Sequence, residues 1–313
     1  MKNILVVTYS QTGQTNAIAN SILSGIDQNV HIDKICIKPL EDYKFPWTGF
    51  DFFNAMPETV LEEKLELKPI NQELKSSYDL ILLGWQPWYL SVNRPILSFM
   101  YSDLGKSLFK NTPVITFLGC RNMWVSANEK MKHHLQKLGA KHVGQMAMVN
   151  QSSNLISLIT ILAWMLKGIK KDYLGIFPDA GIDASYFSRL PECGRIIQKR
   201  LNSENWEGLQ QELLTQKIME VKPALILMEK TGAGNFVKFA KWIKSAPDQK
   251  TRRKRVVFFS RCLPAAIVVL TPIISILRPL QILLKRKQLK KEAEYLLDVK
   301  FEQNRFHSKA NSI

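Results

Sequence analysis

An alternation of apolar runs and helical patterns over the first 150 residues constrains the fold of this chain more than any other feature. The run at 4–9 is β-branched and continuously apolar, which is typical of a strand buried on both faces of a parallel sheet. At 15–26 the apolar residues recur at helical spacing, and the same reasoning predicts later helices near 95–109 and 125–138. Four more strands are predicted at 30–37, 80–84, 114–118 and 143–149. Such alternation predicts an α/β domain with a doubly wound five-stranded parallel sheet.

A long excursion at 38–70 interrupts this alternation near one edge of the sheet. A short helical stretch is predicted within it, near 58–65. Connections of this length inside a domain are more often functional than idle, so we expect the excursion to serve a function. It carries a cluster of aromatic residues, namely Phe45, Trp47, Phe50, Phe52 and Phe53.

The remainder of the chain divides into two parts. Residues 155–166 form a run of twelve without a charge, too short to span a bilayer, and 183–235 has the pattern of ordinary amphipathic helices. We therefore predict a sheet domain at 1–150, a helical extension packed on it at 151–247, and a basic and apolar tail at 248–313.

A hydroxyl-rich loop lies between the first predicted strand and the first helix. Backbone N–H groups and the positive end of the helix dipole make such a place an anion site, and Gly13 permits close approach of the backbone. The loop lacks both the lysine of a Walker sequence and the glycine pattern of a dinucleotide fingerprint. A site for one phosphate without a metal remains, with a plain helix cap as the alternative. The loop residues are Ser10, Gln11, Thr12, Gly13, Gln14 and Thr15.

Two further loops follow the third and fourth predicted strands. Ligands of open α/β sheets bind beyond the carboxyl ends of the strands, at the switch in strand order. Trp88 and Tyr89 follow a proline and can stack on a planar ligand, whereas Trp85 directly follows its strand and is predicted to pack in the core. In the later loop, Arg121 and Asn122 could stabilise a developing negative charge, with a surface turn as their alternative. The other candidates for cofactor binding are Gln86, Pro87, Gly119 and Cys120.

These loops together resemble the flavodoxin-like family, whose phosphate loop has the form Ser/Thr-x-Thr-Gly-x-Thr after the first strand. The resemblance covers about the first 150 residues. It implies the strand order 2-1-3-4-5 and one FMN, whose phosphate lies in the first loop and whose isoalloxazine ring contacts the two later loops. Arg121 and Asn122 would then face a reduced flavin or a substrate enolate.

Over nearly the full chain, the sequence resembles one group within that family, the flavodoxin-like proteins of bacterial dialkylresorcinol and flexirubin-type pigment pathways, often labelled condensing enzymes. The resemblance is carried by 45–47, 56–59, 88–91, 121–124, 173–178 and the tail. Condensation of acyl thioesters needs a nucleophilic cysteine with histidine partners, which nothing around Cys36, Cys120, Cys193 or Cys262 suggests. The resemblance therefore implies a flavin-dependent oxidation, in which a dialkylcyclohexane-1,3-dione becomes an aromatic dialkylresorcinol.

Two other classes of function stay open at this point. One is an NAD(P)H-dependent quinone-type flavin reductase, and the other is a non-catalytic electron-transfer flavodoxin recruited to a membrane. Carrier flavodoxins are usually acidic and compact, whereas this chain has a second half and a formal charge of +16, which favours an enzyme. No metal site is suggested by the spacing of cysteines and histidines.

The positive charge is concentrated near the C-terminus, where 251–291 holds eleven Lys or Arg and no Asp or Glu. The sixteen uncharged residues at 262–277 are too few to span a bilayer, and prolines interrupt helical hydrogen bonding there. We expect a helical hairpin or interfacial segment on the cytoplasmic face of the inner membrane, with a single stretched span or a buried helix as alternatives. Such a place suits a small lipophilic substrate. The apolar block argues against nucleic acid, the absence of a signal-peptide pattern favours the cytoplasm, and a homodimer is open.

Overall fold

A single parallel sheet forms the centre of the protein. The computed structural model describes residues 1–303, and all of their side chains except those of Asn154, Ala224 and 268–281. The sheet has the order β2-β1-β3-β6-β7, so its third, fourth and fifth strands in sequence are β3, β6 and β7. This confirms the predicted flavodoxin-like order 2-1-3-4-5. The strands are β1 (Lys2–Thr8), β2 (Val30–Cys36), β3 (Leu80–Trp85), β6 (Pro113–Cys120) and β7 (Lys141–Val149).

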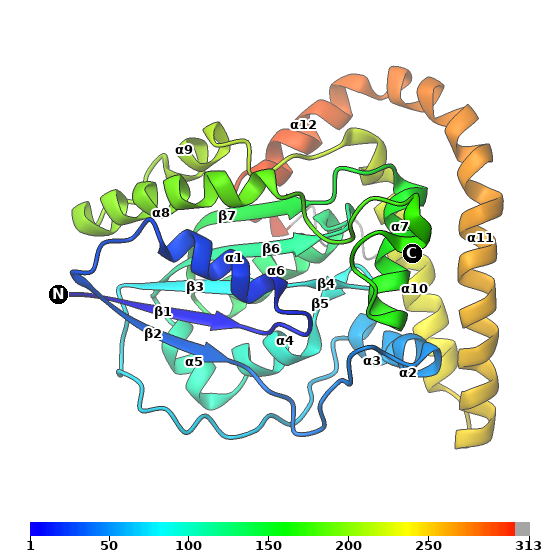
Figure 1. Cartoon of the computed structure of the whole chain (residues 1–313), viewed down its shortest axis with the longest axis horizontal. Coiled ribbons are helices and arrows are strands. Elements are labelled where there is room, and N and C mark those ends of the chain that lie inside the picture. The colour runs from blue at the N-terminus through cyan, green and yellow to red at the C-terminus, as the bar shows by residue number, and fades with distance from the viewer. Residues whose placement is uncertain (304–313) are drawn as a thin grey trace.

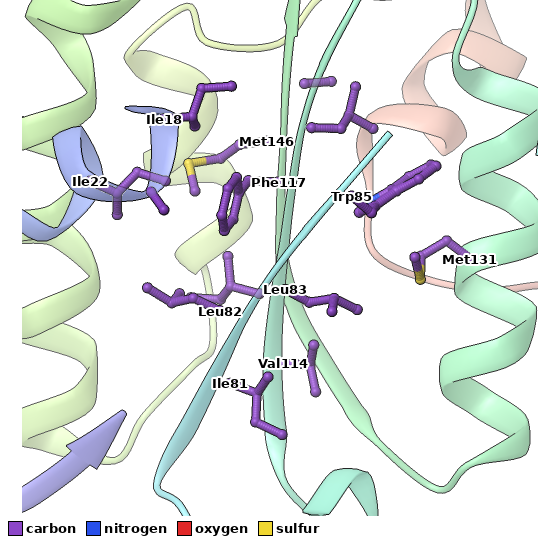
Figure 2. Close-up of a cluster of buried hydrophobic side chains, with 14 of the residues drawn as sticks. Ile18, Ile22, Ile81, Leu82, Leu83, Trp85, Val114, Phe117, Met131 and Met146 are labelled. Carbon is purple, nitrogen blue, oxygen red and sulfur yellow. The ribbon is translucent and has the colours of Figure 1, made fainter. Parts of the chain in front are cut away.

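The central strands are buried on both faces, as their continuous apolar runs predict. Leu82 and Leu83, on opposite faces of β3, are both fully buried. Helix α1 (Gln14–Leu23) covers one face, where Ile18 and Ile22 lie near Phe117 of β6 (Figure 2). Helix α6 (Val125–Lys137) covers the other face, where Met131 lies near Trp85 (Figure 2). The full burial of Trp85 confirms the prediction that it packs in the core.

Two helical predictions needed correction. The helix predicted at 95–109 is two helices, because Ser102 Oγ accepts a hydrogen bond from Gly105 N and starts a second one. These are α4 (Arg94–Met100) and α5 (Asp103–Phe109). In the excursion the helices lie earlier than the predicted 58–65, because Thr48 caps the first of them through Asp51 N. They are α2 (Gly49–Asn54) and α3 (Met56–Val60).

The segment after β7 forms helices that surround the sheet. Helix α8 (Ser185–Ser203) packs closely on α1, since a Cβ on Gly25 would lie 1.8 Å from Pro191 O and one on Gly194 would lie 2.1 Å from Ile22 O. Helix α9 (Leu209–Thr215) lies against β7. The remaining helices of this segment are α7 (Asn154–Lys167), the short 3₁₀ helix η1 (Tyr173–Gly175) and α10 (Pro223–Lys244).

The C-terminal segment forms α11 (Gln249–Leu284) and α12 (Arg286–Leu297). The expected hairpin is wrong, because α11 is one continuous helix and its prolines at 264, 272 and 279 lie inside it. A proline removes one backbone hydrogen bond, which bends a helix without always ending it. Among the residues described, no helix is long and apolar enough to cross a membrane. Helix α12 returns to the sheet domain, where Leu289, Tyr295 and Leu296 join the main core.

Helices from distant parts of the chain gather beyond the carboxyl ends of the strands. Figure 1 shows α2, α3, α7, α10 and α11 at this end of the molecule. Contacts between elements join α10 to α3 and α11, and α11 to α2. A two-stranded hairpin of β4 (Pro87–Trp88) and β5 (Ser91–Val92) lies at the same end, directly after β3. The loops singled out in the sequence therefore lie beneath a layer of helices.

Candidate functional site

The first loop connects β1 to the N-terminus of α1. Gly13 is the residue before the helix, and it adopts the left-handed conformation with φ of 83°. Only glycine adopts this conformation without strain, and no atom lies within 4 Å of the position that a Cβ would occupy. The first turn of α1 has no acidic residue, and no side chain caps its N-terminus. The positive end of the helix is therefore available to an anion from outside the chain.

Two polar atoms in this loop are buried without a hydrogen-bond partner among the described residues. They are Ser10 Oγ and Gln11 Nε2. A buried polar group without a partner costs about 1 to 3 kcal/mol, and a ligand, an ion or a water molecule can remove this cost by bonding to it. A hydroxyl and an amide N–H at the start of a helix are donors that suit phosphate oxygens. The donor set of the loop therefore fits one phosphate group.

The other residues of the loop connect it to neighbouring segments. Thr15 is buried, and its hydroxyl accepts a hydrogen bond of 2.6 Å from Gln86 Nε2. Gln14 Oε1 accepts one of 3.0 Å from Ile182 N, so the Gln14 side chain faces the segment before α8. Thr12 is half-buried at the turn. Ser10 and Gln11 therefore carry donors without partners among the described residues, whereas Gln14 and Thr15 hold the loop against neighbouring segments.

The second loop is tied to the first through Gln86. Its Nε2 donates to Tyr9 O at 3.1 Å as well as to Thr15 Oγ1, so one amide joins the end of β1, the start of α1 and the end of β3. Pro87 then begins the β4–β5 hairpin, whose turn residues Tyr89 and Leu90 both have positive φ. This turn sends consecutive side chains in different directions, and it separates Trp88 from Tyr89.

Trp88 joins an aromatic cluster beside the first loop. Its ring centroid lies 5.8 Å from Tyr9, 5.0 Å from Tyr43 and 5.5 Å from Trp47, all at steep angles between the ring planes. Tyr43 and Trp47 belong to the excursion, so the long connection does reach the carboxyl edge of the sheet. Edge-to-face contacts of this kind hold a half-buried ring in a fixed orientation.

Tyr89 lies in a different environment from Trp88. Its ring packs against Phe52 and Phe236 at 5.6 and 5.9 Å, and its hydroxyl donates to Phe52 O. Burial raises the pKa of the Tyr89 hydroxyl well above its usual value. Tyr89 therefore adjoins a smaller hydrophobic cluster formed by α2, α3, α10 and α11. Phe52, which the Tyr89 ring contacts, also lies 6.0 Å from Trp47 of the cluster around Trp88.

The third loop follows β6 and packs on the helix of the first. A Cβ on Gly119 would lie 2.9 Å from both Gln14 Nε2 and Ile18 Cδ1, so a larger residue here would displace the ends of these two side chains. Asn150 N donates to Cys120 O at 3.1 Å and to Arg121 O at 2.9 Å, which fixes the start of the loop. Burial raises the pKa of the Cys120 thiol, so Cys120 is a packing residue and not a thiolate.

The two polar residues of the third loop are withdrawn from the surface. Asn122 is 8% exposed, which argues against the alternative of a surface turn. Burial lowers the pKa of Arg121 to about 10, so its guanidinium remains protonated at neutral pH. Arg121 Nη2 also lies 3.5 Å from Met123 Sδ. The Arg121 guanidinium is thus a half-buried cation in the loop after β6, and β3 separates that strand from β1, which precedes the phosphate loop.

Glu229 of α10 is a site residue that the sequence analysis missed. It is fully buried, and its carboxylate accepts hydrogen bonds from Trp124 N at 3.0 Å and Ser126 N at 2.9 Å. Burial raises its pKa to about 7, while the hydrogen bonds from this backbone act in the opposite direction. Glu229 therefore caps the N-terminus of α6 from another helix and fixes the end of the third loop. The available signal was a single acid after the apolar run Leu225–Met228, within a segment to which no chemistry was assigned.

Comparisons with known proteins return likenesses to solved flavoproteins. A flavoprotein of Lactobacillus acidophilus NCFM, crystallised with FMN, is 21% identical, with a TM-score of 0.37 over 47% of this chain and 93% of its own. A flavodoxin from the domain Archaea is 14% identical, with a TM-score of 0.35 over 64% of this chain and 99% of its own. No protein-family model matches the chain, and no curated protein matches it. The topology of the sheet is established by its own strand pairing and does not depend on these likenesses.

Proposed function

We propose that this protein binds one FMN non-covalently, with the phosphate in the loop of Ser10–Thr15. The observation that carries the proposal is the pair of buried, unpartnered donors, Ser10 Oγ and Gln11 Nε2, in front of an uncapped helix. Gly13 leaves open space at this point, and no lysine is present for a nucleotide triphosphate. The aromatic cluster around Trp88 and the backbone of the third loop would hold the isoalloxazine ring.

We further propose that the protein oxidises a dialkylcyclohexane-1,3-dione to a dialkylresorcinol. The resemblance of the sequence to the pigment-pathway group supports this choice. The ring loses two hydrogens, one as a hydride and one as the acidic proton between the carbonyl groups. FMN, when bound, supplies the acceptor for the hydride. We assign to Arg121 the stabilisation of the enolate that remains when the proton leaves, because its half-buried guanidinium stays protonated at neutral pH and belongs to the loop after β6.

The condensing activity often attached to this group is not part of the proposal. A condensing enzyme needs a reactive thiolate, whereas burial raises the pKa of Cys120 and of Cys193. These two thiols lie in packed surroundings within the fold. Their environment favours packing over nucleophilic catalysis.

The proposed place of action is the cytoplasmic face of the inner membrane. Helix α11 supports this proposal with an exposed face on which Lys250, Arg253, Lys254 and Arg261 surround Val257 and Phe258. Cations around an apolar centre are the pattern of a helix that lies on anionic lipid. A lipophilic substrate could then reach the protein without crossing water.

The test is the absorption spectrum of the purified protein, followed by anaerobic mixing with a dialkylcyclohexane-1,3-dione. The expected result is an oxidised flavin spectrum that bleaches on mixing, with one resorcinol formed per flavin. A protein without flavin would overturn the cofactor assignment. A flavin that is bleached by NAD(P)H but not by the dione would indicate a reductase, and one bleached by neither would indicate an electron carrier.

A further inference from the structure

The connection between α7 and α8 contains a closed loop with exposed aliphatic side chains. Ala180 N donates to Lys170 O at 2.8 Å, so the chain leaves and returns at one point. We call 169–180 the Leu174 loop. Leu174 is 70% exposed and Ile176 is 79% exposed, far more than the other aliphatic residues of the loop and its neighbouring helix. Two large aliphatic side chains within three residues leave apolar surface in water that a contact with an apolar partner would bury.

The exposed tip has a defined conformation. Asp172 and Leu174 adopt positive φ of 49° and 57°, which is uncommon for residues other than glycine. Gly175 N donates to Asp172 O, and Phe177 N donates to Tyr173 O. The Tyr173 and Phe177 rings lie 5.9 Å apart beneath the tip. The tip is therefore a hydrogen-bonded turn with uncommon backbone conformations, and Leu174 and Ile176 are exposed on it.

The base of the loop is joined directly to the candidate flavin site. Gln14 of the phosphate loop accepts from Ile182 N, and Asn150 Nδ2 donates to Gly181 O at 2.6 Å. At the other end, α7 contacts the excursion, since Trp47 N donates to Met165 O at 2.9 Å. The Leu174 loop is thus a projection from the walls of the site.

The basic face of α11 is joined to the same excursion. Arg252 donates to Asn54 Oδ1 at 3.0 Å, and the Arg253 guanidinium lies 4.8 Å from the centre of the Phe50 ring. Figure 1 places α2, α7 and α11 at the same end of the molecule. Three lysines flank the Leu174 loop, Lys167, Lys170 and Lys171, against Asp172 and Asp179. This end therefore combines projecting aliphatic groups with a surplus of cations.

We propose that the Leu174 loop inserts into an anionic phospholipid bilayer while α11 contacts the headgroups. Aliphatic side chains suit the acyl region, and the cations of α11 are complementary to anionic headgroups. The loop would open a path from the membrane to the phosphate loop on which its base rests. This inference extends the proposed membrane location, and the docking itself does not depend on the identity of the cofactor.

The direct test places an environment-sensitive fluorophore at the tip. In a background of Cys36→Ser and Cys262→Ser, Leu174→Cys and Ile176→Cys are labelled with NBD and mixed with vesicles of phosphatidylglycerol and phosphatidylcholine. Leu104→Cys is the matched control, because Leu104 is a leucine of 40% exposure on α5, away from this end. We expect a blue shift and a severalfold rise in emission at 174 and 176, but not at 104. Equal responses at 174 and 104 would overturn the proposal.

A second measurement keeps the native cysteines and compares vesicle affinity. Leu174→Ser with Ile176→Ser should weaken binding at least about tenfold for each aliphatic side chain withdrawn from the acyl region, whereas Leu104→Ser should not. The flavin spectrum reports whether the site is intact in each variant. Wild-type affinity in the double variant, or a wild-type protein that binds no vesicle, would overturn the docking proposal. Loss of flavin in all proteins with normal vesicle binding would overturn the cofactor and leave the docking standing.

Discussion

Gln145 and Gln11 both have buried side-chain amides, and they differ in whether the chain supplies hydrogen-bond partners for them. Gln145 of β7 is fully satisfied, because its Nε2 donates to Leu296 O and Asp298 O, both at 2.9 Å, and its Oε1 accepts from Asn128 Nδ2. Gln11 of the phosphate loop has a buried Nε2 with no partner among the described residues. The Gln145 amide connects the end of α12 to the sheet, and its donors and acceptor all have partners. The Gln11 amide needs an acceptor from outside the chain to satisfy its N–H groups.

The difference extends to the surroundings of the two residues. Around Gln145, the chain supplies every partner, including Gln210 Oε1, which accepts from Gln145 N at 2.8 Å. Around Gln11, the chain supplies an uncapped helix, an unpartnered Ser10 hydroxyl and a left-handed glycine. The polar network around Gln145 closes on itself and is structural, whereas the one around Gln11 stays open at a helix N-terminus, as the proposed binding of a phosphate requires.

The largest effect is expected from a negative charge in the open loop. Gly13→Asp should weaken FMN binding by about 4 kcal/mol, roughly a thousandfold, because two like charges about 4 Å apart repel by this amount near a protein surface. Fluorescence titration of the apoprotein with FMN measures it. Gly139→Asp is the matched control, because Gly139 also has positive φ and no atom near a Cβ. Equal losses in both variants would attribute the effect to backbone strain and not to the phosphate.

A second prediction concerns Glu229, whose carboxylate accepts two backbone hydrogen bonds but is buried where the charged form is disfavoured. Its pKa is raised from 4.5 to about 7 by burial, so the folded state holds a proton that the unfolded state releases. The stability that the neutral form contributes is fully present below about pH 4.5 and is lost as the pH rises through about 7. Between these limits we expect a loss of about 3 kcal/mol that Glu229→Gln does not show. Urea unfolding at pH 5 and pH 8 measures it.

The control for this pH dependence is Glu294→Gln, at an exposed position of α12. It should follow the wild-type pH dependence. If Glu229→Gln also follows it, the carboxylate is charged throughout the range and the third loop is held by a permanent anion. In that case Glu229 would not titrate in this range, so it would not change the pH dependence of the flavin's midpoint potential.

The parts of the site that depend on local sequence were predictable, and those that depend on tertiary contacts were not. The apolar run at 4–9 correctly predicted the first strand, and the polar loop after it predicted that a helix begins there, because both follow from neighbouring residues. The anion site itself stays a prediction. Strand burial likewise placed Trp85 in the core. Glu229 was missed because its partners, Trp124 N and Ser126 N, lie more than a hundred residues away in sequence.

The different surroundings of Trp88 and Tyr89 could also not be predicted from local sequence patterns. They are adjacent and of the same type, so the sequence assigned both to one ligand. The Tyr89 ring packs against Phe52 and Phe236, whereas the Trp88 ring packs against Tyr9, Tyr43 and Trp47. The continuous helix at 249–284 was also not predicted, because prolines favour a break and the helix passes through all three of them.

The smallest expected effects come from the two glutamines, and they test the comparison directly. Gln145→Met should lower the free energy of unfolding by about 2 kcal/mol, because the buried Asn128 amide and the carbonyls of Leu296 and Asp298 lose their partners. FMN affinity should not change. Gln11→Met has the same change of side chain but removes a buried donor that lacks a partner among the described residues, so the free energy of unfolding of the apoprotein should not fall and should rise by up to about 1 to 3 kcal/mol, the cost of an unsatisfied group. FMN affinity should then fall about tenfold, the value of one hydrogen bond to a charged acceptor.

Urea unfolding of the apoproteins and FMN titration give the free energy of unfolding and the FMN affinity of each variant. If Gln11→Met lost stability as Gln145→Met does and kept its FMN affinity, Gln11 would be a structural amide and the open loop would be only a helix cap.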